Sequence, residues 1–468
     1  MQLKEILKDP VAACAQQWSD TDIATLKLAQ AQALISELDV LKPDLKAAKE
    51  SKQECARHFG KVKAEGGDVD SIKPQMQTCS AELDRLEARR KQLEAELLAL
   101  FTDDIPKAPA LPQQFGSHHR DAPGPIRIAE ITPGERELWD LYVDQHPLAS
   151  LYHQYRWRDV IARSFGHASI YLMARNASGS ICGVLPLVRL RSRLFGDFAV
   201  SMPFFNYGGP LADNPVIQAA LLARAAELAD ARAISHIEAR ATRVLGDEWP
   251  SRTDKVSMIR ALPDSEAALD DELGAKVRAQ IKRGQQENPV VAIGHLDLLD
   301  DFYRVFSINM RDLGTPVYGK DFFRNILKAA PHNAHLVVVR LQGKPVAAAF
   351  LLGHRDMMEI PWASTLRSVN ALNMNMVLYR HVLGFCIERG YHHFDFGRST
   401  IDAGTYKFKK QWGANPVQHH WHYWLRHGGP LPALKPDSPK FRLLIACWQR
   451  LPVAIANVIG PHIVKNLP

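Results

Sequence analysis

From about residue 122 to residue 425 the sequence alternates between segments with the period of a β-strand and longer segments with the period of an α-helix. This alternation predicts a layered α/β or α+β fold. Because the pattern occurs twice, we expect two similar halves separated near residues 242–255. The expected strands are 169–175, 181–190, 197–203, 234–240, 256–260, 290–294, 334–341, 345–353, 357–363, 392–397 and 417–425. The expected helices are 135–145, 154–164, 214–232, 267–284, 298–311, 320–329 and 371–389.

Residues 22–101 carry a different pattern, which predicts a long antiparallel helical hairpin. Apolar residues follow steps of three and four, the 3.5-residue period of a coiled coil. Residues 65–68, EGGD, supply the turn, and Pro43 must start a helical segment or kink the first arm because it has no N–H donor. Cys55 and Cys79 lie symmetrically about residue 67, so we expect them to face each other. They would form a pair of packed thiols or, under oxidising conditions, a disulfide near the tip.

These patterns predict five parts: a helical hairpin at 1–104, a proline-containing linker at 105–121, two subdomains at 122–245 and 246–430, and an amphipathic tail at 431–468. The tail either packs on the body or docks on a partner or a membrane surface. We favour packing, because Arg442, Arg450 and Lys465 give only a weak basic face.

The net charge of +7 is unevenly distributed, with −4 in residues 1–104 and +11 in the remainder. An anionic ligand is therefore expected first in the body. The chain contains no uncharged apolar run of about 18 residues, and its N-terminus lacks the apolar core of a secretory signal. The six cysteines form no CxxC pair, which favours reduced thiols over a disulfide framework or a zinc site. We therefore expect a cytoplasmic protein, with the tail as a candidate contact to the inner face of the membrane.

The segment HFDFGRSTIDAGTYKFKKQWG, residues 393–413, is the main candidate site. A buried strand is expected to end at Gly397, and both Gly397 and Gly404 permit positive φ and close approach of a ligand. If 404–412 forms a helix, its N-terminal N–H groups attract phosphate or carboxylate. Arg398, Lys407 and Lys410 would add an arginine fork and two ammonium groups. The alternative, which composition alone favours, is a glycine-rich loop leading into a surface helix with solvated lysines.

Two further segments leave two interpretations open. Lys282 and Arg283 lie in KVRAQIKRG, which is either an anion site or a solvated helix face. Asn206 and Tyr207 lie in MPFFNYGGP, residues 202–210, which is either a loop where backbone approaches a ligand or a plain turn.

Metal and nucleophile motifs are not found in the sequence. His420 and His422 could share a strand face, but no carboxylate or cysteine accompanies them, so we predict no metal site. Because GxSxG, Walker A and GxGxxG motifs are absent, we expect any acyl transfer to be direct.

The segment SKQECARHFGKVKAEGGDVDSIKPQMQTCSAELDRLEARRKQLEAELLAL resembles the N-terminal tRNA-binding arm of bacterial seryl-tRNA synthetases, which has a similar GxxKxxGxD turn. The resemblance covers roughly residues 20–105 and lacks the class II catalytic motifs, so the chain is not expected to charge tRNA. It implies that Lys52, Arg57, Lys61 and Lys63 contact tRNA.

The body resembles FemAB-like proteins, in particular the branch associated with exosortase/PEP-CTERM polysaccharide systems. The resemblance implies two GNAT-type acyltransferase subdomains and an amine that attacks the aminoacyl ester of a charged tRNA. It is carried, in family order, by YHQYRWRDVIARSFGH, FFNYGGPLAD, KVRAQIKRGQQENPV, RDLGTPVYGKDFF, NMNMVLYRHV and FDFGRSTIDAGTYKFKKQWGANP.

The FemAB resemblance also implies site residues. Lys407, Phe408 and Lys410 are the leading positions for contact with substrate phosphate or the tRNA terminus, and Asp395 is the candidate base for the incoming ammonium. Further substrate contacts are Arg158, Asn206, Tyr207, Lys282, Arg283, Arg398, Tyr406 and Lys409. Bridge-forming Fem enzymes often carry a substrate-binding lysine after the tryptophan of the first helix. Arg158 and Arg163 in that helix count against a UDP-linked muropeptide as substrate.

Three hypotheses follow. The first is an aminoacyl-tRNA-dependent aminoacyltransferase that acts on an amine of a cell-envelope glycan or peptide, with tRNA as partner and no cofactor beyond this co-substrate. The second is a GNAT-type transferase that moves an acyl group from acyl-CoA to an amine or hydroxyl of an exopolysaccharide. The third is a non-catalytic tRNA-binding or scaffold protein, because apolar helical seams are often structural.

Overall fold

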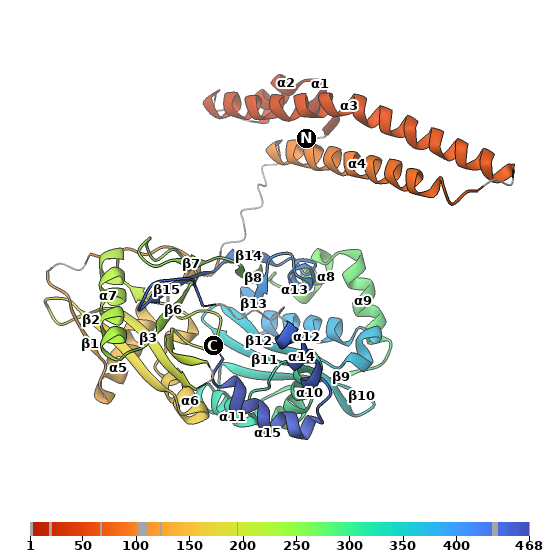
Figure 1. The fold of residues 1–468 in the computed structure, drawn as a ribbon. Coiled ribbons are helices and arrows are strands. Elements are labelled where there is room, and N and C mark those ends of the chain that lie inside the picture. Colours follow the sequence, from red (N-terminus) through yellow and green to blue (C-terminus); the bar gives the residue numbers. More distant parts are fainter. Residues whose placement is uncertain are drawn as a thin grey trace. The chain divides into compact units, whose positions relative to one another are not determined.

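The computed structural model describes residues 3–17, 21–65, 68–101, 111–121, 124–193, 195–432 and 439–467. The chain forms two compact units, Met1–Pro109 and Ala110–Pro468 (Figure 1). Across the described ranges, no helix combines the length and the apolar character that a membrane crossing requires.

The first unit is a helical hairpin. Its helices are α1 Leu3–Lys8, α2 Pro10–Gln17, α3 Thr21–Ala64 and α4 Lys73–Phe101. The long helices are antiparallel, because Glu37 pairs with Arg89 near one end while Cys55 meets Cys79 near the other. Pro43 lies inside α3.

The apolar seam of the hairpin is buried as the sequence predicts. Leu38 and Leu45 of α3 are buried together with Leu83, Leu86, Leu93 and Leu97 of α4. The two cysteines are free thiols whose Sγ atoms lie 3.2 Å apart, so the prediction that they face each other is confirmed.

The second unit contains two mixed sheets covered by helices, which confirms the predicted fold class. Its helices are α5 Arg136–Gln145, α6 Arg156–Phe165, α7 Pro215–Ala231, α8 Glu266–Glu272, α9 Ala275–Gln285, α10 Leu299–Leu313, α11 Lys320–Ala329, α12 Met374–Glu388, α13 Gly404–Lys410, α14 Pro439–Trp448 and α15 Val453–Val464. Short 3-10 turns include Gln113–Phe115 and Leu151–His153.

The first sheet has the order β1-β2-β3-β4-β6-β15-β7, with β5 paired to β3. Its strands are β1 Arg127–Glu130, β2 Ala168–Arg175, β3 Ile181–Ser192, β4 Gly196–Val200, β5 Leu211–Ala212, β6 His236–Ala241, β7 Ser251–Arg252 and β15 His420–Leu425. The second sheet has the order β14-β8-β13-β12-β11-β10-β9. Its strands are β8 Lys255–Ala261, β9 Val290–Gly294, β10 Ala334–Leu341, β11 Lys344–His354, β12 Met357–Thr365, β13 His393–Thr400 and β14 Asn415–Gln418.

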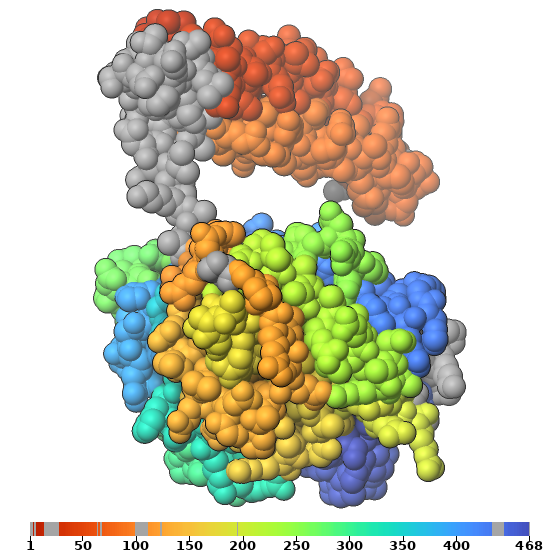
Figure 2. Space-filling view, turned by 90° about the vertical axis from the view of Figure 1, so that its left-hand side faces the viewer, coloured from red at the N-terminus to blue at the C-terminus, as the bar shows by residue number. Residues whose placement is uncertain are grey.

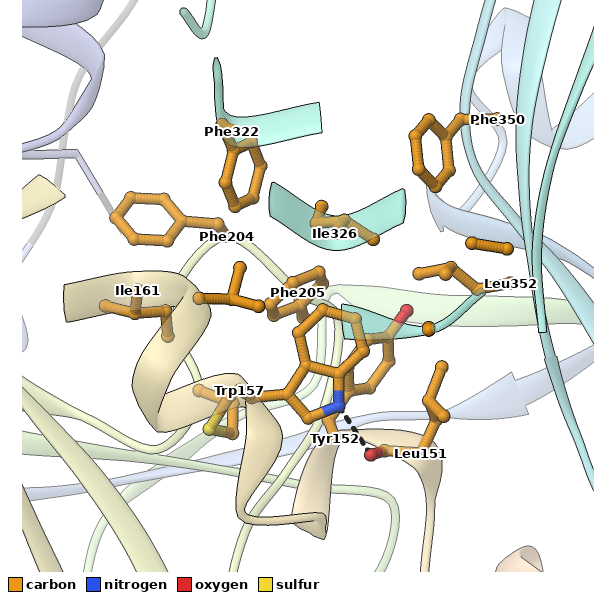
Figure 3. Packing of buried hydrophobic residues seen from close by; sticks show 14 of the residues in the cluster. Leu151, Tyr152, Trp157, Ile161, Phe204, Phe205, Phe322, Ile326, Phe350 and Leu352 are labelled. Atoms are coloured by element: carbon orange, nitrogen blue, oxygen red, sulfur yellow. Dashed lines mark hydrogen bonds between the residues drawn. The ribbon is translucent and has the colours of Figure 1, made fainter. Parts of the chain in front are cut away.

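Alternation along the strands builds three apolar layers. In β10, Leu336 and Val338 face a cluster that includes α10 and α11, whereas Val337 and Val339 face α9 and α12. The first sheet packs its other face on α7. The cluster that includes α10 and α11 contains residues of both halves. Phe205 and Trp157 come from the first half, and Phe322 and Phe350 come from the second (Figure 3). This shared core holds the two halves together.

Three predicted elements differ from the structure. The helix expected at 267–284 is broken, because Leu273 and Gly274 are extended between α8 and α9. The strand expected at 417–425 divides into β14 and β15, which lie in different sheets. The strand expected to end at Gly397 continues through a bulge to Thr400.

The described part of the linker and the tail both contact the sheets and helices of the second unit. Of the expected linker, residues 105–110 lie outside the described residues, whereas Arg120 donates its backbone N–H to the carbonyl of Asp213. Figure 2 shows that the early part of this unit's sequence, coloured orange and yellow, forms one of its faces. In the tail, α15 contacts α10, and Arg311 donates to the carbonyl of Leu451, which agrees with packing. The division at residues 245 and 246 stays a prediction, and β15 crosses it to join the first sheet.

Candidate functional site

The two parallel strands β12 and β13 pair over only three residues, ending at Glu359 opposite Asp395. Beyond this pair β13 bulges, because Gly397 has a φ of +75°. A Cβ there would lie 3.2 Å from the carbonyl oxygen of Ile360, so the positive φ favours glycine and a side chain would also crowd this carbonyl. Ligands in open α/β sheets bind where the carboxyl ends of neighbouring strands part. The point of divergence here carries two buried carboxyl groups.

Residues of the first half hold these carboxyl groups. The Tyr152 hydroxyl donates to Glu359 Oε2 at 2.5 Å, and Asn206 Nδ2 donates to Oε1 at 2.7 Å. The Tyr207 hydroxyl donates to Asp395 at 3.3 Å. Gln114 in turn donates to Tyr207 at 3.2 Å. The site is therefore built across the junction of the two halves.

The loop that supplies Asn206 and Tyr207 has an unusual backbone. Met202 and Phe204 have φ values of +57° and +74°, in the left-handed region that bulky side chains rarely adopt. Phe204 and Phe205 are anchored in the aromatic core beside Phe322 (Figure 3). The packing energy of these rings holds the strained loop in place, and such strain is typical of functional positions.

Lys409 of α13 enters the site from the other side. Its Nζ donates to the carbonyls of Gly397 and Arg398, both at 2.9 Å, and its side chain is only 8% exposed. Its charge lies close enough to Asp395 and Glu359 to stabilise their ionised forms. A buried ammonium group, bonded to backbone carbonyls, thus lies near two buried carboxyl groups.

Burial sets the proton affinities of this trio. Removal from water raises the pKa of Glu359, and the neighbouring Asp395 raises it further. Burial also raises the pKa of Asp395, against the hydrogen bond from the Gly397 N–H. Burial lowers the pKa of Lys409 to about 8, although both carboxyl groups oppose this shift. All three groups can therefore exchange protons near neutral pH, as acid–base chemistry requires.

An open pocket of about 210 Å³ lies beyond the divergence of the strands. Tyr379 of α12 and Phe408 of α13 line it, with ring centroids 5.1 Å apart. Its polar lining comes from Asn309, Ser364, Thr365, Asn370 and Asn375. Apolar rings and uncharged hydrogen-bonding groups in one pocket suit a small acyl group with polar substituents.

The corresponding point of the first sheet is closed. There the parallel pair β4 and β6 ends at Val200 opposite Glu238. Arg240 donates to Glu238 Oε1 at 2.6 Å, and Tyr423 donates to Oε2 at 2.8 Å. The carboxylate of the first sheet is therefore neutralised by its own neighbours, and the second sheet is the better candidate for chemistry.

The structure brings together some of the sequence-predicted site residues and separates others. Asn206, Tyr207, Asp395 and Lys409 contribute to the buried cluster, and Phe408 lines the open pocket further along β12. Lys407 and Lys410 are exposed on α13. Arg398 is exposed, with its guanidinium 5.0 Å from the Trp421 ring centroid, and Tyr406 packs at the edge of the second core. Gly404 begins α13 without using the positive φ that glycine permits.

The remaining predicted residues lie elsewhere in their units. Lys282 and Arg283 are exposed on α9, and Arg158 is half-buried against the ring of Tyr155. In the first unit, Arg57 and Lys61 are exposed on α3 and Lys52 is half-buried. The side chain of Lys63 lies outside the described residues.

Sequence reasoning missed Glu359, Tyr152 and Gln114. For Glu359 a signal was present, because it is a single carboxylate within the apolar strand MMEIPWA, and a buried charge needs partners. Tyr152 and Gln114 gave no such signal. Their roles depend on contacts with residues more than 90 positions away.

A second opening, of about 280 Å³, lies between α6 and α11. Its charged and amide lining consists of Arg136, Arg156, Asp159, Arg163, Asn325 and Lys328. Four cations against one carboxylate suit an anionic group. Of the two α6 arginines singled out in the sequence, Arg163 lines this opening and Arg158 does not.

One cluster has the composition of a metal site. Nitrogen atoms of His118 and His146 and a carboxylate oxygen of Asp213 lie within 4.8 Å of one another. However, His146 Nδ1 accepts the backbone N–H of Leu148, so its Nε2 carries the proton and faces the Ala212 carbonyl at 3.2 Å. In this tautomer His146 offers no lone pair to a cation.

Comparisons with known proteins agree with this architecture. Residues 274–410 match the family model described as Acetyltransferase (GNAT) domain. The chain therefore contains a GNAT-type acyltransferase domain. The match includes Glu359, Asp395 and Lys409.

Among solved structures, FemX is 15% identical with a TM-score of 0.51, and the alignment covers 68% of this chain and 100% of FemX. L-PGS from Bacillus licheniformis is 13% identical, with a TM-score of 0.42 and coverage of 69% and 98%. A tandem GNAT protein from the clavulanic acid biosynthesis pathway is 12% identical, with a TM-score of 0.41 and coverage of 64% and 98%. Comparison with curated protein sequences gave no match. FemX therefore establishes the fold of the second unit, and its reaction is not transferred by this likeness.

Proposed function

We propose that this acyltransferase moves an amino acid from an aminoacyl-tRNA to an amine of a cell-envelope or peptide acceptor. The observation that carries the proposal is the buried trio of Glu359, Asp395 and Lys409 at the divergence of β12 and β13, with an open pocket further along β12 at Ala363–Thr365. An aminoacyl ester is already activated, so an enzyme needs to orient it, stabilise the developing oxyanion and remove a proton from the attacking amine.

The roles follow from the charges. The acyl group occupies the pocket lined by Tyr379 and Phe408, and the Glu359–Asp395 pair takes the proton of the incoming ammonium. Their raised pKa values suit this task near neutral pH. Lys409 stabilises the oxyanion of the tetrahedral intermediate. Collapse of that intermediate breaks the ester C–O bond, and the ribose oxygen of the tRNA leaves with the proton that the carboxyl pair took from the amine, so no covalent enzyme intermediate forms. Lys407 and Lys410, exposed on the same short helix, contact phosphates of the donor.

The first unit supports tRNA as the donor through its resemblance to a synthetase arm. Its exposed cations Arg57 and Lys61 lie on α3, where they would contact the phosphate backbone. The acceptor carries an anionic group that binds the basic opening between α6 and α11. The FemX-like fold and the proposed link to exosortase-type polysaccharide systems both suit a cell-envelope acceptor.

A second candidate donor is acyl-CoA, which is favoured by the match to a model described as an acetyltransferase domain. A transfer assay with purified protein decides between them, with charged tRNA and acyl-CoA offered separately to a panel of amine acceptors. Product from charged tRNA alone supports the proposal, whereas product from acyl-CoA without tRNA supports the alternative.

Filter binding tests the role of the first unit. We expect charged and uncharged tRNA to bind at low salt, with affinity that falls as salt rises. The double change Arg57→Glu with Lys61→Glu should weaken binding at least tenfold, while Lys42→Glu on the same helix serves as the matched control. Failure of the wild-type protein to bind tRNA at low salt would sink the tRNA hypothesis.

A further inference from the structure

Helix α15 is apolar on both of its faces. One face packs on the body through the buried Ala456, Gly460 and Val464. The other face carries Ile455, Val458 and Ile459, which are 44%, 68% and 41% exposed. A helix that is apolar all round normally lies inside a protein or in a lipid environment. Here the second face has no cover within the described part of the chain.

The apolar surface continues onto neighbouring elements. Leu444 of α14 is 55% exposed, and Leu313, at the end of α10, is also exposed. These elements adjoin, because a Cβ on Gly314 would lie 2.5 Å from Ile445. Figure 1 shows α14 and α15 in dark blue, with α15 at the edge of the unit. Exposed aliphatic side chains thus occur on elements that adjoin one another.

The charge of this region has one sign. Residues 439–468 contain Lys440, Arg442, Arg450 and Lys465 and no aspartate or glutamate. Arg450 is exposed just beyond α14, and its guanidinium donates to the backbone carbonyl of Ala446. Within this tail segment the apolar face is accompanied only by cations, which is complementary to an interface that is apolar beneath and anionic above.

We propose that the exposed face of α15, with Leu444, docks on the surface of a bilayer that contains anionic lipids. Apolar side chains enter the boundary between headgroups and acyl chains, and the cations meet the headgroup charges. A second copy of the chain fits less well, because a symmetric contact would bring the two cationic surfaces together. RNA fits less well, because its phosphates would pair with the cations but would leave Ile455, Val458 and Ile459 exposed to water. This inference is independent of the proposed reaction.

The test uses the full chain and sedimentation with large vesicles, either of pure phosphatidylcholine or with added phosphatidylglycerol. We expect binding to the anionic vesicles that weakens as NaCl is raised. Val458→Asp should reduce the partition coefficient at least about tenfold, and Arg450→Gln should reduce it about fivefold. Val216→Asp is the matched control, because Val216 is 71% exposed on α7 and should leave binding unchanged.

Each outcome has one meaning, provided circular dichroism shows that the variants are folded. Wild-type binding that Val458→Asp weakens and Val216→Asp leaves intact supports the proposal. Absence of binding to either vesicle overturns it, as does equal binding by Val458→Asp. Equal binding to neutral and anionic vesicles overturns the role of the cations. If the wild type instead self-associates in a way that Val458→Asp abolishes, a second copy covers this face.

Discussion

Replacing Lys409 by methionine should separate catalysis from stability. The change removes two hydrogen bonds to the carbonyls of Gly397 and Arg398, each worth about 1.5–3 kcal/mol for a charged donor. It also removes the cost of burying an ammonium group, which offsets part of that loss. We therefore expect the free energy of unfolding to fall by about 2–4 kcal/mol. Removal of a preorganised oxyanion donor lowers kcat about 10²–10³-fold, so transfer should fall by at least about a hundredfold.

Activity is measured as single-turnover transfer from whichever donor, charged tRNA or acyl-CoA, gives product in the transfer assay. Stability is measured by urea unfolding. Lys410→Met is the matched control, because it removes the same charge from the exposed face of the same helix. This control variant should raise KM and leave kcat unchanged. The pH dependence gives a second readout: Lys409 favours the ionised carboxyl groups, so Lys409→Met should move the acidic limb of the rate profile to higher pH. Transfer within threefold of the wild type, with an unmoved acidic limb, would refute the role of Lys409.

Three further predictions follow from the same contacts. Burial raises the pKa of Glu359 from 4.5 to about 8. The folded state therefore holds this proton between these two pH values while the unfolded state loses it, so the free energy of unfolding should fall as pH rises from 4.5 to about 8. In urea unfolding, the stability of Glu359→Gln should depend less on pH over this range. Trp157→Ala should destabilise the second unit by about 3–5 kcal/mol in denaturant unfolding, because the buried ring also bonds to the Leu151 carbonyl (Figure 3). Gly397→Ala should lower kcat at least tenfold while circular dichroism stays unchanged, because the positive φ and the Ile360 carbonyl oppose a Cβ; full activity would contradict a tight bulge.

Local periodicity predicted most elements of the second unit. β9, β10 and α11 have the boundaries expected from the sequence, since each has a clear apolar period and a distinct end. The hairpin seam was equally readable, including the contact of Cys55 with Cys79. The strands β1, β5 and β7 were missed; β5 and β7 have two residues each, which carry no period.

The candidate site was predictable in part. The segment 393–413 and the loop 202–210 were recognised from glycines, aromatic residues and charges, and both contribute to the cluster. Within the first segment, however, the sequence favoured Lys407 and Lys410 over Lys409. Three lysines within four positions of one helix differ only in the face that each occupies, and that face is set by the packing of α13 on β13.

The sequence by itself therefore determined the two kinds of architecture in this chain, the basic character of the body and two of the segments that supply the buried cluster. These properties depend on residue type and on spacing along a few turns or strands. Only the tertiary structure decided that Glu359 meets Asp395, that Tyr152 and Asn206 reach them from the first half, and that β15 returns to the first sheet. The reason is physical: strand divergence, burial and the resulting proton affinities arise from contacts between residues far apart in the chain, which local patterns do not encode.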